Sequence, residues 1–259
     1  MNIREIEVKS ILTRSKLTGD GYTINPYVGC QHACVYCYAC FMKRFSQHDE
    51  SWGEFVDVKI NAADVFEKNF RKVKDGEGAF IGSATDAYHP LELKYELTRK
   101  ILQKIVDARK NSLIPKDFSV SILTKSDLVL RDIDLLKQIP GVEVGFSVSM
   151  PNEKARRLFE PRAKPVKQRF AALKTLREEG IATFGFIAPI LPKITDLPVI
   201  FELLEGNVAY VFGEALNRHC GNMAQILRAV TLYDRDLCSS FEKQCKDREY
   251  WNSVEQQFY

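Results

Sequence analysis

The residues Cys30-Gln31-His32-Ala33-Cys34-Val35-Tyr36-Cys37 place three cysteines within eight positions, at the spacing Cys-x3-Cys-x2-Cys. Thiolates are soft ligands that select iron–sulfur clusters and zinc. Three thiolates at this spacing can hold three corners of a cubane [4Fe-4S] cluster, and one iron is then left without a protein ligand. That iron stays open to a small molecule. The predicted metal ligands are therefore Cys30, Cys34 and Cys37.

A structural zinc site is the alternative for the same cysteines. Zinc in such sites takes four protein ligands, commonly from two separated knuckles, and here the downstream partner knuckle is missing. A disulfide between Cys34 and Cys37 requires an oxidising compartment, and nothing in the sequence indicates secretion. A zinc-binding or iron–sulfur module without catalytic activity stays open as an alternative.

Composition limits the class of protein. The chain has 259 residues, 45% of them hydrophobic, which is enough for one sizeable core. Its 37 basic and 34 acidic residues give a net charge of +3, which neither indicates nor excludes a nucleic-acid binder. No apolar run is long enough to span a membrane, and the first residues lack the apolar core of a signal peptide. We expect a cytoplasmic enzyme with no membrane partner.

Short β-rich runs alternate with amphipathic helical stretches along the chain. The predicted strands are Val56–Ile60, Ala79–Ala84, Phe118–Leu123, Val142–Val148, Ile181–Ile187 and Val208–Phe212. Predicted helices lie near residues 62–72, 93–108, 128–138, 166–180 and 197–204, and one long helix near 223–241. Such alternation predicts a parallel sheet with right-handed crossovers, here an α/β fold of the partial (β/α)6 TIM-type barrel kind with a C-terminal helical extension. We expect one domain over residues 1–259, with a core at about 20–215 and a helical tail at about 221–250.

The cysteine spacing, with the aromatic residue Tyr36 before its last cysteine, resembles the radical S-adenosylmethionine (SAM) superfamily. The resemblance implies that SAM binds the open iron and is cleaved by an incoming electron to methionine and a 5′-deoxyadenosyl radical, which takes a hydrogen atom from a substrate. It implies an oxygen-sensitive enzyme whose cofactors are a [4Fe-4S] cluster and SAM, with a reductant such as flavodoxin or ferredoxin as partner. In relatives the residue at the position of Tyr36 packs near the adenine.

Polar residues end several predicted strands, where the chemistry of an α/β barrel is found. Gly82–Asp86 is either a capped turn or, as in relatives, an acceptor for the SAM amino group. Lys125 either pairs with the SAM carboxylate or is solvated, and Arg162 is a possible carboxylate clamp. Ser147 and Ser149 face the same side of their strand. The segment Ala188–Pro192 either lines the adenine pocket or is only a loop. The candidate SAM-binding residues are Tyr36, Ser83, Ala84, Thr85, Lys125, Ser147, Ser149, Arg162 and Ile190.

Several stretches together resemble the spore photoproduct lyase-like (DNA repair photolyase-like) branch of that superfamily. They are Asn25–Cys30, the cluster loop with Tyr38 and Ala39, Leu123–Ser126, Phe159–Arg162 and Ala188–Pro192, within about residues 20–195. Some members of this branch repair a thymine dimer in DNA. Those lyases return a hydrogen atom from a cysteine in the barrel, whereas here no cysteine lies between Cys40 and Cys220.

The candidates for returning a hydrogen atom to a product radical are Cys40, Tyr88 and Cys220. Cys40 is alternatively a buried small hydrophobic residue. Cys238 and Cys245 lie seven positions apart on the predicted C-terminal helix, roughly 10 Å along its axis, which is too far for a disulfide. A second cluster built from Cys220, Cys238 and Cys245 stays open.

The leading hypothesis is a radical SAM enzyme, either a lyase or an oxidoreductase, that acts on an unidentified small molecule or peptide. A lyase that repairs DNA is the first alternative. The basic residues from Lys154 to Arg169 either contact phosphates, as such a lyase requires, or form a solvated helix face. A small-molecule or peptide substrate predicts a closed mouth with Val208–Gly221 as a lid.

Overall fold

The computed structural model describes residues 1–15 and 21–259, so residue 20, the predicted start of the core, lies outside the described residues. Its larger sheet has the strand order β10-β9-β8-β7-β6-β3-β2. Strand β2 runs antiparallel to β3, and every other pair in this sheet is parallel. The strands are β2 (Leu12–Ser15), β3 (Gly21–Ile24), β6 (Gly78–Ile81), β7 (Ser119–Thr124), β8 (Glu143–Ser147), β9 (Ala182–Ile190) and β10 (Tyr210–Ala215).

Six mutually parallel strands confirm the predicted α/β fold class, but one of the six was assigned wrongly. The first parallel strand is β3, and the predicted strand Val56–Ile60 is β5 (Phe55–Lys59) of a separate sheet. There β5 lies between β1 (Asn2–Ile6) and β4 (Tyr27–Val28). A short strand that begins with glycine carries too little periodicity to be recognised. Strand β5 has the pattern of a buried strand because it is the central strand of the small sheet, where Phe55, Val56 and Val58 are completely buried.

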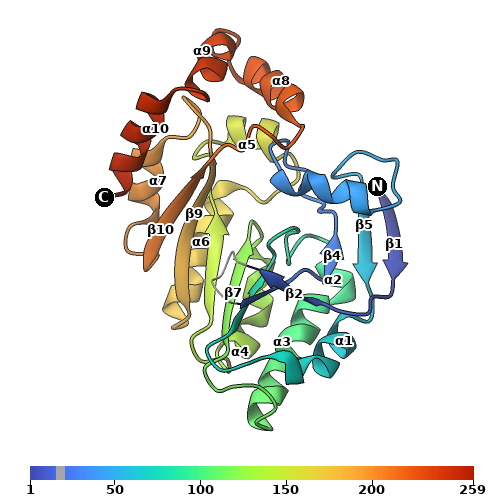
Figure 1. Ribbon diagram of the computed structural model, residues 1–259. Coiled ribbons are helices and arrows are strands. Elements are labelled where there is room, and N and C mark those ends of the chain that lie inside the picture. The colour runs from blue at the N-terminus through green and yellow to red at the C-terminus, as the bar shows by residue number, and fades with distance from the viewer. Residues whose placement is uncertain (16–20) are drawn as a thin grey trace.

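The helices between the strands pack on the outer face of the larger sheet (Figure 1). The longest is α3, whose Ile101, Leu102 and Ile105 are completely buried. Burial of one such side chain contributes about 1.5–3 kcal/mol. The helices of this part are α1 (Ala62–Lys68), α2 (Glu92–Tyr95), α3 (Leu97–Lys110), α4 (Ile133–Leu136), α5 (Glu153–Phe159), α6 (Val166–Glu178) and α7 (Leu197–Leu204), with 3-10 turns η1 (Tyr38–Phe45), η2 (Phe70–Lys72) and η3 (Asp127–Asp132).

The predicted long C-terminal helix is wrong, because the chain breaks it at Asp234. It forms α8 (Met223–Tyr233), α9 (Leu237–Gln244), α10 (Arg248–Glu255) and the turn η4 (Gln256–Phe258). Asp234 is extended, and the Asp247 carboxylate accepts hydrogen bonds from two backbone N–H groups to start α10. Cys238 and Cys245 nevertheless share one helix, because Cys245 caps α9 in a still-helical backbone conformation, so their spacing argument holds and both thiols are free.

These last helices arch over one end of the barrel and descend beside α7 and β10 (Figure 1). Val254 joins the main core, and the Phe258 ring lies against Gly213 of β10. Within residues 1–15 and 21–259, no helix is both long and apolar enough to cross a bilayer.

Candidate functional site

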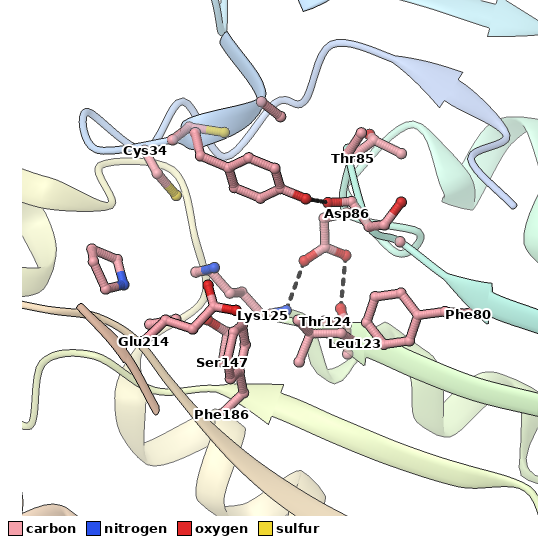
Figure 2. Close-up of a pocket in the computed structure, with 18 of the residues that line it drawn as sticks. Cys34, Phe80, Thr85, Asp86, Leu123, Thr124, Lys125, Ser147, Phe186 and Glu214 are labelled. Carbon is pink, nitrogen blue, oxygen red and sulfur yellow. Dashed lines mark hydrogen bonds between the residues drawn. The ribbon is translucent and has the colours of Figure 1, made fainter. Parts of the chain in front are cut away.

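A cavity of about 600 Å³ opens at the carboxyl ends of the parallel strands and continues into the barrel (Figure 2). Cys30, Cys34 and Cys37 form part of its wall. Most of the rest comes from the ends and inner faces of β6 to β10, among them Ser83, Lys125 and Ser147. An open barrel leaves this interior unfilled, whereas a closed α/β barrel packs it with side chains.

The three thiols suit a thiolate-bound cluster. Cys30 is buried, and Cys34 and Cys37 are partly buried. Burial raises the pKa of the Cys30 thiol to about 12 and that of Cys34 well above its ordinary value. The thiols thus hold their protons until iron binds, and loading releases those protons. Among the described residues no three His, Cys, Asp or Glu side chains converge on a single metal ion.

The loop that bears these cysteines is fixed by three distant parts of the chain. The Thr85 hydroxyl donates to the carbonyl of Gly29 at 2.6 Å. The Val35 N–H donates to the Phe159 carbonyl at 2.9 Å. The Asn222 amide donates to the carbonyls of Val35 and Cys37 at 3.1 and 3.2 Å. Each bond satisfies a loop backbone group that a regular helix or strand would otherwise pair.

Behind the loop lies a buried ionic group that the sequence analysis missed. Glu160 accepts hydrogen bonds from the Tyr36 hydroxyl and from the Arg169 guanidinium. Glu160 and Arg169 are each about 1% exposed. Burial alone would raise the pKa of Glu160, but the charges of Arg169 and Lys125 hold it below its usual value. Glu160 is therefore an ionised anchor for Tyr36. The signal was present in Phe159–Arg162, where the glutamate is the informative residue.

Asp86 joins the ends of two strands and was also missed. Its carboxylate accepts hydrogen bonds from the Thr124 hydroxyl and the Lys125 N–H, both at 2.7 Å (Figure 2). His32 Nε2 of the cluster loop lies 3.0 Å from Asp86 Oδ2, the oxygen that also accepts from the Lys125 N–H. Burial would raise the pKa of Asp86, but the charge of His32 and these hydrogen bonds depress it below its usual range. Asp86 thereby positions Lys125 against the cysteine loop.

Six predicted SAM-binding residues lie in the cavity wall, and they are Tyr36, Ser83, Ala84, Thr85, Lys125 and Ser147. The Ser147 hydroxyl is buried and has no hydrogen-bond partner in the described ranges 1–15 and 21–259, so it is available to a ligand. Burial alone would lower the pKa of Lys125, but Cys34 and Glu160 raise it above the ordinary value, which keeps the ammonium charged. The Thr85 hydroxyl is already used by Gly29.

The Ser83–Ala84 segment is held by Asn25, another residue the sequence analysis did not select as a site residue. Its side-chain amide donates to the Ser83 hydroxyl at 2.9 Å and accepts from the Ala84 N–H at 2.8 Å.

Three other predicted SAM ligands lie elsewhere. The Ser149 hydroxyl donates to the Ala188 carbonyl at 2.5 Å. Ile190 is a core residue, and its neighbours Ala188 and Pro189 line the cavity instead. The Arg162 guanidinium donates to the Gly53 carbonyl and pairs with Glu54. These contacts use the polar groups of Ser149 and Arg162, so we no longer assign the three residues to SAM.

The predicted hydrogen donors are not brought into the cavity either. Tyr88 is completely buried, and its hydroxyl donates to Asp132 at 3.1 Å on the outer side of the sheet. Cys40 and Cys220 meet near the mouth, where the Cys40 sulfur lies 3.1 Å from the Cys220 carbonyl oxygen. In the described part of the chain, the cysteines that line the cavity are the three of the cluster motif.

Two of the seven basic residues from Lys154 to Arg169 are buried inside the protein, and the other five are exposed. Arg156 is buried and donates to the carbonyls of Glu160 and Ala163, both at 3.0 Å. Lys164 pairs with Asp127 at 3.1 Å. Neither a phosphate-binding run nor a solvated helix face describes Arg156, Arg162 or Arg169.

Comparison with known proteins agrees with this geometry. The model of the Radical SAM superfamily matches residues 24–201. The chain is 37% identical to "Uncharacterized protein MJ0683" of Methanocaldococcus jannaschii, over 84% of this chain and 78% of the relative. It is 33% identical to "Uncharacterized protein ORF301" of Acidianus two-tailed virus, over 82% and 72% of the two chains.

Among solved structures, the fold is similar to that of spore photoproduct lyase complexed with dinucleoside spore photoproduct. The TM-score is 0.63 at 16% identity, and the match covers 88% of this chain but 66% of the lyase, just under two thirds of it. Members of the superfamily use a [4Fe-4S] cluster and SAM, and these are the cofactors that the residues of the cavity fit. The chain belongs to the radical SAM superfamily.

Proposed function

We propose that this protein is a radical SAM enzyme that removes a hydrogen atom from a small molecule or from a peptide side chain. When bound, the cluster and SAM together supply the radical for that step. The observation that carries the proposal is the arrangement of the cavity. Its mouth is shared by three thiols, a charged lysine and a buried serine to which no described residue hydrogen-bonds, and the same cavity continues into the barrel interior.

The residues of this chain have separable tasks in the proposal. Lys125 and Ser147 bind polar groups of SAM, the lysine by charge and the serine through its unused hydroxyl. Asp86 fixes the backbone from which Lys125 projects. Glu160 and Arg169 hold Tyr36 and the cysteine loop from behind. The apolar walls beyond SAM exclude water from the reacting atoms.

A substrate other than DNA is supported by the contacts of the basic run. Arg156 and Arg169 are buried in internal hydrogen bonds and an ion pair, and Arg162 and Lys164 pair with Glu54 and Asp127 at the surface. Retention on DNA measured at low and at raised salt tests this directly. Strong retention that falls steeply with salt would favour the DNA-repair alternative.

Turnover is tested by anaerobic reconstitution with iron and sulfide, followed by dithionite and SAM. The wild-type protein should form 5′-deoxyadenosine. Cys34→Ala should form no 5′-deoxyadenosine and should bind less iron. Cys238→Ser, a change outside the cavity, should retain both the product and the iron. A filled cluster without 5′-deoxyadenosine would refute the proposal, and a colourless protein that contains zinc would favour the non-catalytic module.

We further propose a flavodoxin or ferredoxin as the electron donor, because the cofactor pair requires a one-electron reductant. Whether the reaction is that of a lyase or of an oxidoreductase follows from the fate of the substrate. Product analysis decides between them.

A further inference from the structure

The inner part of the cavity has an aromatic wall. Phe184 and Phe186 of β9 and Tyr210 and Phe212 of β10 project into it from alternate positions of neighbouring strands. The rings of Phe184 and Tyr210 are 3° from parallel with centroids 5.4 Å apart, and those of Phe184 and Phe212 are 28° from parallel at 5.6 Å. Tyr210 and Phe212 stay 45% and 40% exposed, so their ring faces are available to a ligand.

A polar edge borders this wall. Glu143 of β8 accepts hydrogen bonds from the Ser121 hydroxyl at 2.6 Å and from the Tyr210 hydroxyl at 2.8 Å. These bonds fix the carboxylate beside the Tyr210 ring. Each carboxylate oxygen keeps a second lone pair, which can accept a further hydrogen bond from a ligand.

A glycine makes room for one ring of the wall. The strand register places Leu123, Gly145, Phe184 and Tyr210 in one layer across the sheet. In a closed barrel such a layer is filled by branched side chains. Here the Phe184 ring lies directly over Gly145, where a Cβ atom would be 2.0 Å from the ring. The layer is thus shaped around flat rings.

We propose that the substrate of this enzyme presents a planar aromatic ring, which stacks on Tyr210 and Phe212 and donates a hydrogen bond from its edge to Glu143. The inference rests on the proposed function, since it assigns the inner cavity to the substrate and the mouth to SAM. Stacking on these rings favours a flat π-system over a saturated ring of similar volume. The ring belongs either to an aromatic side chain or to a heteroaromatic base.

The test uses the reconstituted enzyme with SAM and without reductant. Dissociation constants are measured by calorimetry for p-cresol, for uracil and for 4-methylcyclohexanol, a saturated analogue of p-cresol. One of the two planar probes should bind at least tenfold more tightly than the saturated one, and which of them does so identifies the source of the ring. Phe212→Leu should weaken that probe by about three- to tenfold. Phe45→Leu, the same change at a position 69% exposed and outside the cavity, should leave it unchanged.

Several results would overturn the inference. Equal affinity for planar and saturated probes removes the stacking argument. If Phe212→Leu or Tyr210→Leu raises the SAM concentration needed for turnover and spares probe binding, the wall holds the adenine of SAM instead. Adding dithionite to the same wild-type sample reports on the proposed function separately. Formation of 5′-deoxyadenosine without preferential binding of a planar probe refutes this inference alone, whereas its absence from a filled cluster refutes the proposed function.

Discussion

Replacing Arg169 by methionine tests whether a buried ion pair supports the cysteine loop. In the folded protein this guanidinium pairs with Glu160 and also donates to the Ser147 carbonyl at 3.0 Å. Removal of Arg169 leaves the Glu160 carboxylate, about 1% exposed, without its cationic partner. The free energy of unfolding should fall by about 3–5 kcal/mol. Natural domains are stable by only about 5–15 kcal/mol, so Arg169→Met should lower the urea midpoint substantially at unchanged slope. The iron content after reconstitution should fall as well, because Glu160 also anchors Tyr36.

The matched control is Arg162→Met, seven positions earlier. Arg162 pairs with Glu54 where both side chains are 44% exposed, and such a pair contributes at most about 1 kcal/mol. The double variant Arg169→Met with Glu160→Gln removes both charges and should recover part of the loss. Equal losses for Arg162→Met and Arg169→Met, or a double variant less stable than Arg169→Met alone, would contradict the reasoning.

Three further predictions concern the same cavity and its supports. Lys125→Met should raise the KM for SAM about 10- to 100-fold in the 5′-deoxyadenosine assay, because a charged hydrogen bond is lost. The control Lys167→Met, at an exposed position, should leave the KM unchanged. An unchanged KM for Lys125→Met would remove this residue from the SAM site. Gly145→Ala should lower the free energy of unfolding in urea by about 1–3 kcal/mol, because the added Cβ would lie 2.0 Å from the Phe184 ring. An unchanged free energy of unfolding would show that the ring is not fixed over Gly145. Burial lowers the pKa of His89 from 6.5 to about 3, so the unfolded chain binds a proton in this range that the folded chain does not. The free energy of unfolding that depends on neutral His89 is fully present above pH 6.5 and falls by about 1.4 kcal/mol per pH unit toward pH 3. His89→Gln should flatten this slope when the free energy of unfolding is measured against pH.

The fold class was predictable because its signal is repeated. Alternating strands and helices along the chain specify a parallel sheet whichever single element is misjudged, and the error over β5 did not change the class. The break of the C-terminal helix was not predictable from its apolar positions, because Leu237 and Phe241 keep a helical spacing while Asp234 turns the chain. A local backbone preference overrode the periodic pattern there.

The site was predictable where chemistry depends on local spacing and not where it depends on distant contacts. The cysteine motif lies within eight residues, and its thiols share one cavity. Glu160 and Arg169 are identified only once α6 packs behind the loop, and the aromatic wall appears only when β9 and β10 pair in register. The error over Arg162 has the same origin, since its partner Glu54 lies more than 100 residues earlier.

The anchoring of the cysteine loop makes a short motif depend on much later sequence. Thr85 and Phe159 precede the last two strands of the sheet, whereas Asn222 follows them. Asn222 lies 187 positions after Val35 and 185 after Cys37, whose carbonyls it holds. A segment of eight residues that can be recognised by its spacing alone therefore takes its native shape only when contacts of very long range have formed.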